Sequence, residues 1–181
     1  MWQSITNLFI YTGLRRGEAV GIEWNDIDYD DQSILLMHNL QQGENGLYVN
    51  PLKDKQARRI YPSEDFFELL NKYRDELISY LGKENLPDYV YYNTDRNRRL
   101  KPNEVSDYYK AFGKKCNLKI NPHKFRHSVG NNMAGIDISS FTIADCLGDG
   151  IEVVNKHYAN DSNSRVRQAT KKYIAVVEGA E

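Results

Sequence analysis

Two arginine motifs, a lysine between them and a tyrosine that follows them are the residues of this chain best suited to chemistry. The first motif, TGLRRGE, contains Arg15, and the second, HKFRH, contains Arg126; Lys53 lies between them and Tyr158 comes later. Cleaving a phosphodiester without a metal requires positive charge for the non-bridging oxygens, an in-line nucleophile and an acid for the leaving oxygen. Arginine suits the first task because its planar, permanently charged guanidinium matches two phosphate oxygens. The set therefore indicates attack on a phosphodiester.

Each of these residues has a more ordinary explanation when it is taken alone. An isolated arginine is usually a surface residue paired with a carboxylate, and a tyrosine, one of 13 here, usually packs in a core or an interface. His123 and Arg126 are three residues apart, so on a helix they share a face, with His127 beside them. Such a pair is common by chance. Only the order and context of the whole set favour the chemical interpretation.

The elements that must position these residues are mainly helical. Apolar periodicity and capping signals predict helices over residues 3–12, 17–20, 63–81, from 103 to beyond 112, 122–135, 139–147, 151–158 and 164–177. Three strands are predicted over residues 33–40, 47–49 and 57–61, with the turn GENG between the first two. The expected fold is α+β, mainly helical, with a small three-stranded antiparallel sheet whose last connection carries Lys53.

Length and composition indicate one domain with a substantial core. The chain has 181 residues, of which 40% are hydrophobic and 27% charged, and no apolar run is long enough to span a bilayer. Two cysteines without metal-like spacing favour a reduced, intracellular protein. The chain also has no GK[ST] phosphate loop, so no nucleotide cofactor is expected.

The distribution of charge is more informative than the net charge of −1. Basic residues cluster around residues 53–59, 96–101 and 110–126, whereas acidic residues concentrate at 23–31 and 64–84. This segregation could create one basic face for a phosphate backbone, although a mixed, solvated surface is the simpler interpretation of charge alone.

The motifs, taken in order, resemble the catalytic domain of the tyrosine recombinases, the phage integrase family. TGLRRGE followed by EWNDID resembles the first box of the family, with Arg15 as its arginine and Glu18 as the acidic residue that supports it. Lys53, in KDKQARR, is similar to the family's lysine turn between two strands. The resemblance covers essentially the whole chain.

The second half of the chain carries the rest of the resemblance. HKFRH matches the second box, with His123 and Arg126 as its histidine and arginine, and His127 next to them. CLGD matches a segment that ordinarily reads Leu-Gly-His, and Tyr158 follows its last residue, Asp149, by nine positions. Tyr158 therefore falls where the family has its nucleophile.

The resemblance implies a transesterification that needs no metal and no cofactor. Tyr158 would attack the scissile phosphate, which gives a 3′-phosphotyrosyl intermediate and a free 5′-hydroxyl. Lys53 would protonate the 5′-oxygen, and Arg15 and Arg126 would stabilise the pentavalent transition state. His123 would take or relay the tyrosine proton, or hold a phosphate oxygen.

Asp149 departs from the family pattern, which has histidine or tryptophan at this position. An ionised aspartate cannot donate a hydrogen bond and would repel a phosphate. Three alternatives are open: Asp149 points away and pairs with a nearby cation, Asp149 is protonated in the DNA complex, or His157 supplies the missing donor. The first is favoured, because His157 adjoins Tyr158 and should face elsewhere.

The resemblance also sets expectations for domains and partners. The expected assignment is a catalytic domain over residues 1–181 without the family's N-terminal core-binding domain, so that Met1 would begin a cut or partial product with weak DNA binding. Double-stranded DNA is the expected partner, with Arg16, Lys55, Arg99 and Lys124 as candidate phosphate contacts. Other protomers, in a tetramer on DNA, and accessory DNA-bending proteins are further expected partners, and a membrane is not.

The expected function is site-specific DNA recombination for the integration or excision of a mobile element, in the cytoplasm at a bacterial nucleoid or in a phage-infected host. The alternatives are a topoisomerase IB-like enzyme that nicks and reseals, and a catalytically impaired DNA-binding relative. A plain helical interaction domain would leave the order of the motifs unexplained. The last helix could dock on a neighbouring protomer, but folding back onto its own domain is the expectation for this chain.

Overall fold

The computed structural model describes residues 1–43, 46–51, 57–158 and 162–177. The segments that were expected to carry Lys53 and Lys55 lie outside these residues. The α-helices are α1 (Trp2–Thr12), α2 (Arg16–Ala19), α3 (Glu64–Leu81), α4 (Pro102–Cys116), α5 (Pro122–Gly135), α6 (Ser140–Leu147), α7 (Ile151–Tyr158) and α8 (Ser162–Val177). Short 3-10 helices span Trp24–Asp26 and Lys83–Asn85. The predicted helices are therefore confirmed, with shifts of a few residues at their ends.

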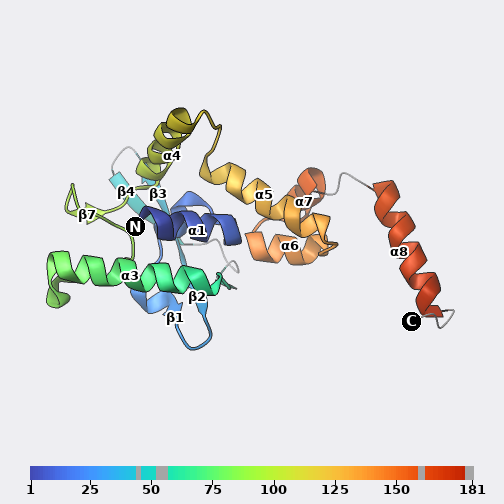
Figure 1. Ribbon diagram of the computed structural model, residues 1–181, viewed down its shortest axis with the longest axis horizontal. Helices are drawn as coiled ribbons and strands as arrows, with labels where there is room; N and C mark the ends of the chain where they lie inside the picture. Colours follow the sequence, from blue (N-terminus) through green and yellow to red (C-terminus); the bar gives the residue numbers. More distant parts are fainter. Residues whose placement is uncertain (44–45, 52–56, 159–161, 178–181) are drawn as a thin grey trace.

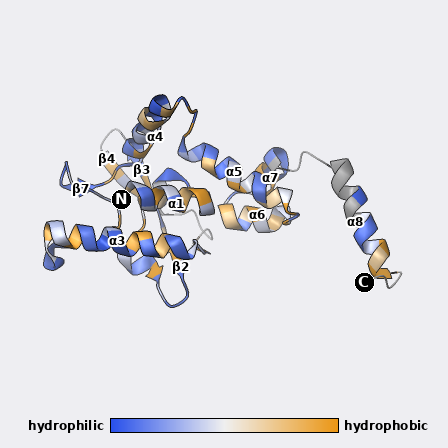
Figure 2. Cartoon of the chain, viewed as in Figure 1, coloured by the Kyte–Doolittle hydropathy of each residue, from blue (hydrophilic) through white to orange (hydrophobic). Residues whose placement is uncertain are grey.

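Capping residues and acidic first turns mark where several helices begin. Ser63 precedes α3, whose first turn carries Glu64 and Asp65, and acidic residues there favour the helix dipole. Apolar and polar residues alternate along α3 (Figure 2), and its apolar residues Phe66, Phe67, Leu70, Tyr73 and Leu77 are buried. Asn121 caps α5 by accepting a hydrogen bond from the Lys124 backbone amide, and Ser139 caps α6 in the same way through Thr142.

Within the described residues the strands form three small antiparallel sheets, not the single sheet that was predicted. The strands are β1 (Ile27–Asp28), β2 (Ser33–Leu36), β3 (His38–Gly43), β4 (Gly46–Pro51), β5 (Arg58–Ile60), β6 (Tyr92–Asn93) and β7 (Arg98–Arg99). A three-stranded sheet exists, in the order β1-β2-β5, but β3 and β4 form a separate hairpin. The predicted strand over residues 33–40 was wrong in its continuity, because the chain leaves the sheet at Met37, which is exposed.

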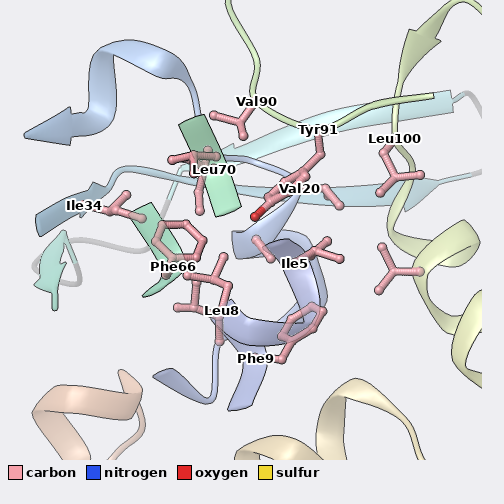
Figure 3. Close-up of a cluster of buried hydrophobic side chains, with 14 of the residues drawn as sticks. Ile5, Leu8, Phe9, Val20, Ile34, Phe66, Leu70, Val90, Tyr91 and Leu100 are labelled. Carbon is pink, nitrogen blue, oxygen red and sulfur yellow. The ribbon is translucent and has the colours of Figure 1, made fainter. Parts of the chain in front are cut away.

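The larger hydrophobic core lies between α1, α3 and the strands. Figure 3 shows Ile5 and Leu8 of α1 near Phe66 and Leu70 of α3, with Ile34 from β2 beside them, while Phe9 packs against Tyr109 and Phe125. A smaller cluster joins α5, α6 and α7 through six buried side chains, Val129, Ala134, Ile143, Ala144, Leu147 and Val154. Arg15 follows α1 of the larger core, whereas Arg126 lies on α5, which contributes Val129 and Ala134 to the smaller cluster and packs Phe125 against the larger one.

Helix α8 stands apart from the rest of the molecule (Figure 1). Tyr173, Val176 and Val177 are exposed, and an ion pair of 3.6 Å joins Lys172 to Asp137 in the loop before α6. The structure thus differs from the expectation that this helix packs back onto its own domain. Within the described residues, no helix has the length and apolar character needed to cross a membrane.

Candidate active site

A close approach of α1 to α5 brings the two arginine motifs together. Gly13 ends α1 with a φ of +62°, in the left-handed region that glycine tolerates best. A Cβ atom at this position would lie 3.3 Å from the Arg126 Cα and 3.0 Å from a Leu147 methyl group. Glycine thus serves two purposes in TGLRRGE: it turns the chain toward Arg15 and it makes room for α5.

Arg126 is held almost entirely inside the protein. Its residue is 4% exposed, and its guanidinium donates to the carbonyl oxygens of Gly13, at 3.0 Å, and Leu147, at 2.7 Å. Burial, followed by the nearby charge of Arg15, lowers the pKa of Arg126, and Asp149 acts in the opposite direction. Arg126 is therefore a cation held in a fixed position. Its guanidinium also contacts Asp149 and lies close to Arg15.

Asp149 bridges the two arginines. Its Oδ1 atom accepts a hydrogen bond from Arg15 Nη2 at 2.6 Å, and its Oδ2 atom lies 2.6 Å from Arg126 Nη2. Asp149 therefore pairs with cations, as the favoured alternative expected. That alternative was wrong about its direction, however, because the side chain points into the site and not away from it.

Glu18 holds Arg15 in place through a carboxylate that is completely buried. It accepts from the Arg15 backbone amide and from Arg15 Nη1, both at 2.9 Å. Its two oxygens also accept from Arg58, at 3.1 and 3.0 Å. The family resemblance implied this support of Arg15 by Glu18, and the structure shows the ion pair.

Arg58 is the residue of this site that the sequence analysis missed. Besides its bidentate pairing with Glu18, it donates to the carbonyl oxygens of Cys146 and Leu147, at 3.2 and 3.0 Å. Arg58 was predicted only as part of a basic cluster. Strand alternation could have indicated its position. Arg58 pairs with Leu36 of β2, and Ile60, two residues after Arg58, is buried. Residues two apart on a strand share a face, so Arg58 faces the interior as Ile60 does.

Three histidines line one side of the site. His123 and His127 lie on successive turns of α5 with their Nε2 atoms 3.0 Å apart, and the His127 ring lies 5.7 Å, centroid to centroid, from that of His157 on α7. Burial, then the charges of His123 and His157, lower the pKa of His127. This contact fixes the last turn of α7, which ends at Tyr158, beside α5.

A cleft of about 400 Å³ opens over the arginines. Its lining includes Arg15, Arg16, His123, Arg126 and Ser106 of α4. The predicted sharing of a face by His123 and Arg126 is thus observed. The described residues contain no group of three His, Cys, Asp or Glu side chains placed to bind a metal ion.

The remaining predicted residues lie in different settings. Tyr158 is the last residue of α7, but its side chain, like Lys53 and Lys55, falls outside what the structure describes; β4 and β5 flank the lysine segment. Arg16 lines the cleft and donates to the Ser106 hydroxyl, and Lys124 is exposed on α5.

Arg99 lies elsewhere and is used internally. It donates to the carbonyl oxygens of Val20 and Gly21, at 3.1 and 2.9 Å, and pairs with Glu23. Its cation also lies over the ring of Tyr89. The structure therefore gives Arg99 a structural role and does not bring it to the arginine pair.

The comparison with known families agrees with this geometry. A model of the phage integrase family matches residues 2–165. The chain belongs to the phage integrase family. A probable integrase/recombinase of Acholeplasma phage L2 is 28% identical over 176 residues, which are 95% of this chain and 53% of that protein. The tyrosine recombinase XerA of Pyrococcus horikoshii is 33% identical over 172 residues, 91% of this chain and 52% of the relative. The chain thus spans about half the length of the curated relatives it matches.

Solved structures of family members share the fold. The integrase of transposon Tn1549, in complex with circular intermediate DNA, superposes with a TM-score of 0.79 at 16% identity, over 94% of this chain and 59% of that one. The XerA recombinase gives a TM-score of 0.67 at 20% identity, over 94% and 55% of the two chains. These likenesses show that the helices and small sheets described above form the catalytic-domain fold of the family.

Proposed function

We propose that this chain is the catalytic domain of a site-specific DNA recombinase, which cleaves and rejoins double-stranded DNA through a 3′-phosphotyrosyl intermediate. The observation that carries the proposal is the convergence of Arg15 and Arg126 on the two oxygens of a single carboxylate, both at 2.6 Å. Two guanidinium groups so aligned can hold two oxygens of one phosphate. Membership of the integrase family supports the same assignment.

The proposed reaction is an exchange of phosphate esters. The Tyr158 oxygen forms a bond to phosphorus, the bond from phosphorus to the 5′-oxygen breaks, and Lys53 delivers the proton that the 5′-oxygen needs. His123 takes the proton of the tyrosine, either directly or through His127, which lies 3.0 Å away. Arg15 and Arg126 balance the charge that develops on the phosphate. The phosphotyrosine retains the ester, so the hydroxyl of a second strand can reverse the step.

Partners follow from the same reaction. Strand exchange between two duplexes requires several active sites, so we propose assembly of the whole protein as a tetramer on DNA, with accessory DNA-bending proteins where the sites need them. Arg16 lines the cleft and Lys124 follows the cleft residue His123 on α5; we propose both as contacts to neighbouring phosphates. A mobile element as the substrate, and action in the cytoplasm where the DNA lies, complete the proposal. The complexes of the Tn1549 integrase with its transposon DNA support this choice of substrate class.

A catalytically impaired DNA-binding relative is the second candidate, and Asp149 is the observation that favours it. The carboxylate neutralises the two cations that would have to meet the phosphate. This candidate predicts DNA binding without any covalent product.

The test is the formation of a covalent adduct on supercoiled plasmid that carries the DNA flanking the gene. After a detergent quench, we expect protein attached to a DNA 3′-phosphate, and we expect Tyr158→Phe to abolish the adduct. Tyr173→Phe, at an exposed tyrosine of α8, is the matched control and should leave the yield unchanged. Binding without an adduct in wild-type protein would favour the impaired relative. Recombinant products from a plasmid with two sites would distinguish a recombinase from a nicking and resealing enzyme.

A further inference from the structure

The arginine pair already holds an anion that belongs to the protein. Asp149 presents one oxygen to Arg15 and the other to Arg126, each at 2.6 Å, and its side chain is 15% exposed. The guanidinium N–H groups of arginine donate to carboxylate oxygens and to phosphate oxygens alike. We propose that Asp149 is an internal substitute for the scissile phosphate, which closes the arginine site in the free protein and must be displaced when a phosphate enters. This inference rests on the proposed function, because it assigns the site to a phosphate.

The electrostatic setting explains why the free protein needs such an anion. The side chain of Arg126 is 5% exposed, and Arg15 is the second cation of the same site. Glu18 is hydrogen-bonded to Arg15 and Arg58; its charge also acts on Arg126, but its carboxylate oxygens are engaged by the other two arginines, and Asp149 is the carboxylate in direct contact with Arg126. A buried cation without a partner is strongly unfavourable, so Asp149 stabilises the empty site.

The local backbone allows the carboxylate to leave while its main chain stays in place. Asp149 lies between Gly148, which ends α6 with a φ of +65°, and Gly150, which precedes α7. Its backbone amide donates to the Ala144 carbonyl oxygen at 3.0 Å and anchors the residue. Displacement of the carboxylate would then consist of a rotation of the Asp149 side chain, with this backbone hydrogen bond kept.

Competition for the same guanidinium atoms has a thermodynamic consequence. A phosphate gains its contacts to Arg15 and Arg126 only after those of Asp149 are lost, so the carboxylate subtracts from the affinity of the site for anions. Replacing Asp149 with asparagine keeps the shape, removes the negative charge and supplies an amide donor. The variant should therefore bind phosphate more tightly while its empty form is less stable. A purely structural counter-ion would lower stability without any gain in affinity.

The experiment measures binding of inorganic phosphate to the intact chain by NMR titration, which is independent of DNA cleavage. We expect Asp149→Asn to lower the dissociation constant at least tenfold. Asp145→Asn, at an exposed carboxylate of α6, removes the same charge nearby and should change the constant less than twofold. Adding Arg126→Gln to Asp149→Asn should abolish the gain. An unchanged or weaker affinity in Asp149→Asn would overturn the proposal.

A second measurement uses wild-type protein and so does not depend on the folding of any variant. The carboxyl 13C resonance of Asp149 should shift on saturation with phosphate, because the group loses both arginine partners. If phosphate binds and the resonance does not move, Asp149 is not displaced and the proposal fails. Absence of the covalent DNA adduct, by contrast, would refute the proposed function and leave these two results unaffected.

Discussion

At the scale of single residues, Glu18 links Arg15 to Arg58. Its buried carboxylate receives Arg15 from the turn after α1 and Arg58 from β5, so it fixes the first arginine with respect to the sheet. Arg58 in turn holds the carbonyl oxygens at the end of α6, the segment that leads to Asp149. The geometry of the arginine pair thus depends on Glu18, whose carboxylate is completely buried.

We expect Glu18→Gln to destabilise the protein by about 3 kcal/mol, because removal of one partner leaves buried arginine charge uncompensated. Chemical denaturation would measure the loss in free energy of unfolding. Glu152→Gln, an exposed position on α7, is the control and should change it by less than about 0.5 kcal/mol. Equal effects of the two substitutions would show that the Glu18 network contributes nothing special.

The same carboxylate makes stability depend on acidic pH. Burial by itself would raise the pKa of Glu18, but hydrogen bonds and charge from Arg58, with Arg15, outweigh it, and the net pKa is lowered. Its contribution is therefore present above the ordinary glutamate pKa and is lost as the pH falls through the lowered value in the folded state. We expect wild-type protein to lose more free energy of unfolding than Glu18→Gln over this acidic range. Parallel pH profiles for the two proteins would contradict this.

At the scale of elements, the end of α6 is packed directly against Arg58. Gly148 has a φ of +65°, and a Cβ atom there would lie 2.5 Å from Arg58 Nη1 and 2.7 Å from its Cζ. A side chain at this position would have to adopt a strained backbone conformation and displace the Arg58 guanidinium, so glycine fits the path of the segment between α6 and α7 best. This short connection positions both Asp149 and the helix that carries Tyr158.

Gly148→Ala should destabilise the protein by about 1–3 kcal/mol, from backbone strain together with displacement of Arg58. It should also reduce the yield of covalent DNA adduct. Gly150→Ala, where an added Cβ meets nothing within 4 Å, should stay within about 0.5 kcal/mol of wild type. Thermal and denaturant unfolding of both variants would check this pair, and a tolerated Gly148→Ala would mean that the segment has another path.

Most of the helices could be predicted from the local sequence. Periodicity and capping located the helices, because Phe66 and Leu70 repeat at helical spacing and Asn121 and Ser139 are strong caps. The motif order located Arg15 and Arg126. Local patterns could not show that residues 33–40 divide between two sheets, since both halves read as a strand.

Tertiary contacts account for what the sequence did not reveal. Arg58 lies 40 residues from Glu18, and Arg15 lies 134 residues from Asp149, so neither pairing has a local signal. The charge of Asp149 was evident as an anomaly for a phosphate site. Its direction, into the arginine pair, depends on how α6 meets α1 and α5, which spacing alone does not fix.

At the scale of the whole molecule, the site lies where two packed units meet. One unit contains α1, α3 and the strands, the other α5, α6 and α7, and Gly13 and Leu147 provide the carbonyl oxygens that join Arg126 to both. Helix α8 contributes little to either core. Its apolar end, visible in Figure 2, includes Val176, which is 79% exposed.

Substitutions on α8 should therefore leave the stability of the folded chain almost unchanged. We expect Tyr173→Ser to alter the free energy of unfolding by less than about 0.5 kcal/mol, because this side chain is 70% exposed. Leu147→Ala, at a fully buried residue of the smaller core, should cost about 2–5 kcal/mol. A large loss for Tyr173→Ser in denaturant unfolding would show that α8 packs on the domain.

The most direct test of the central claim is to identify the atom that becomes joined to DNA. A duplex with a nick beside the cleavage site traps the intermediate, because the short cleaved strand diffuses away and cannot reverse the reaction. Mass spectrometry of the digested adduct would locate the modified residue. The account predicts a single peptide with Tyr158 joined to a 3′-phosphate. Attachment through a different residue, or to a 5′-phosphate, would contradict it.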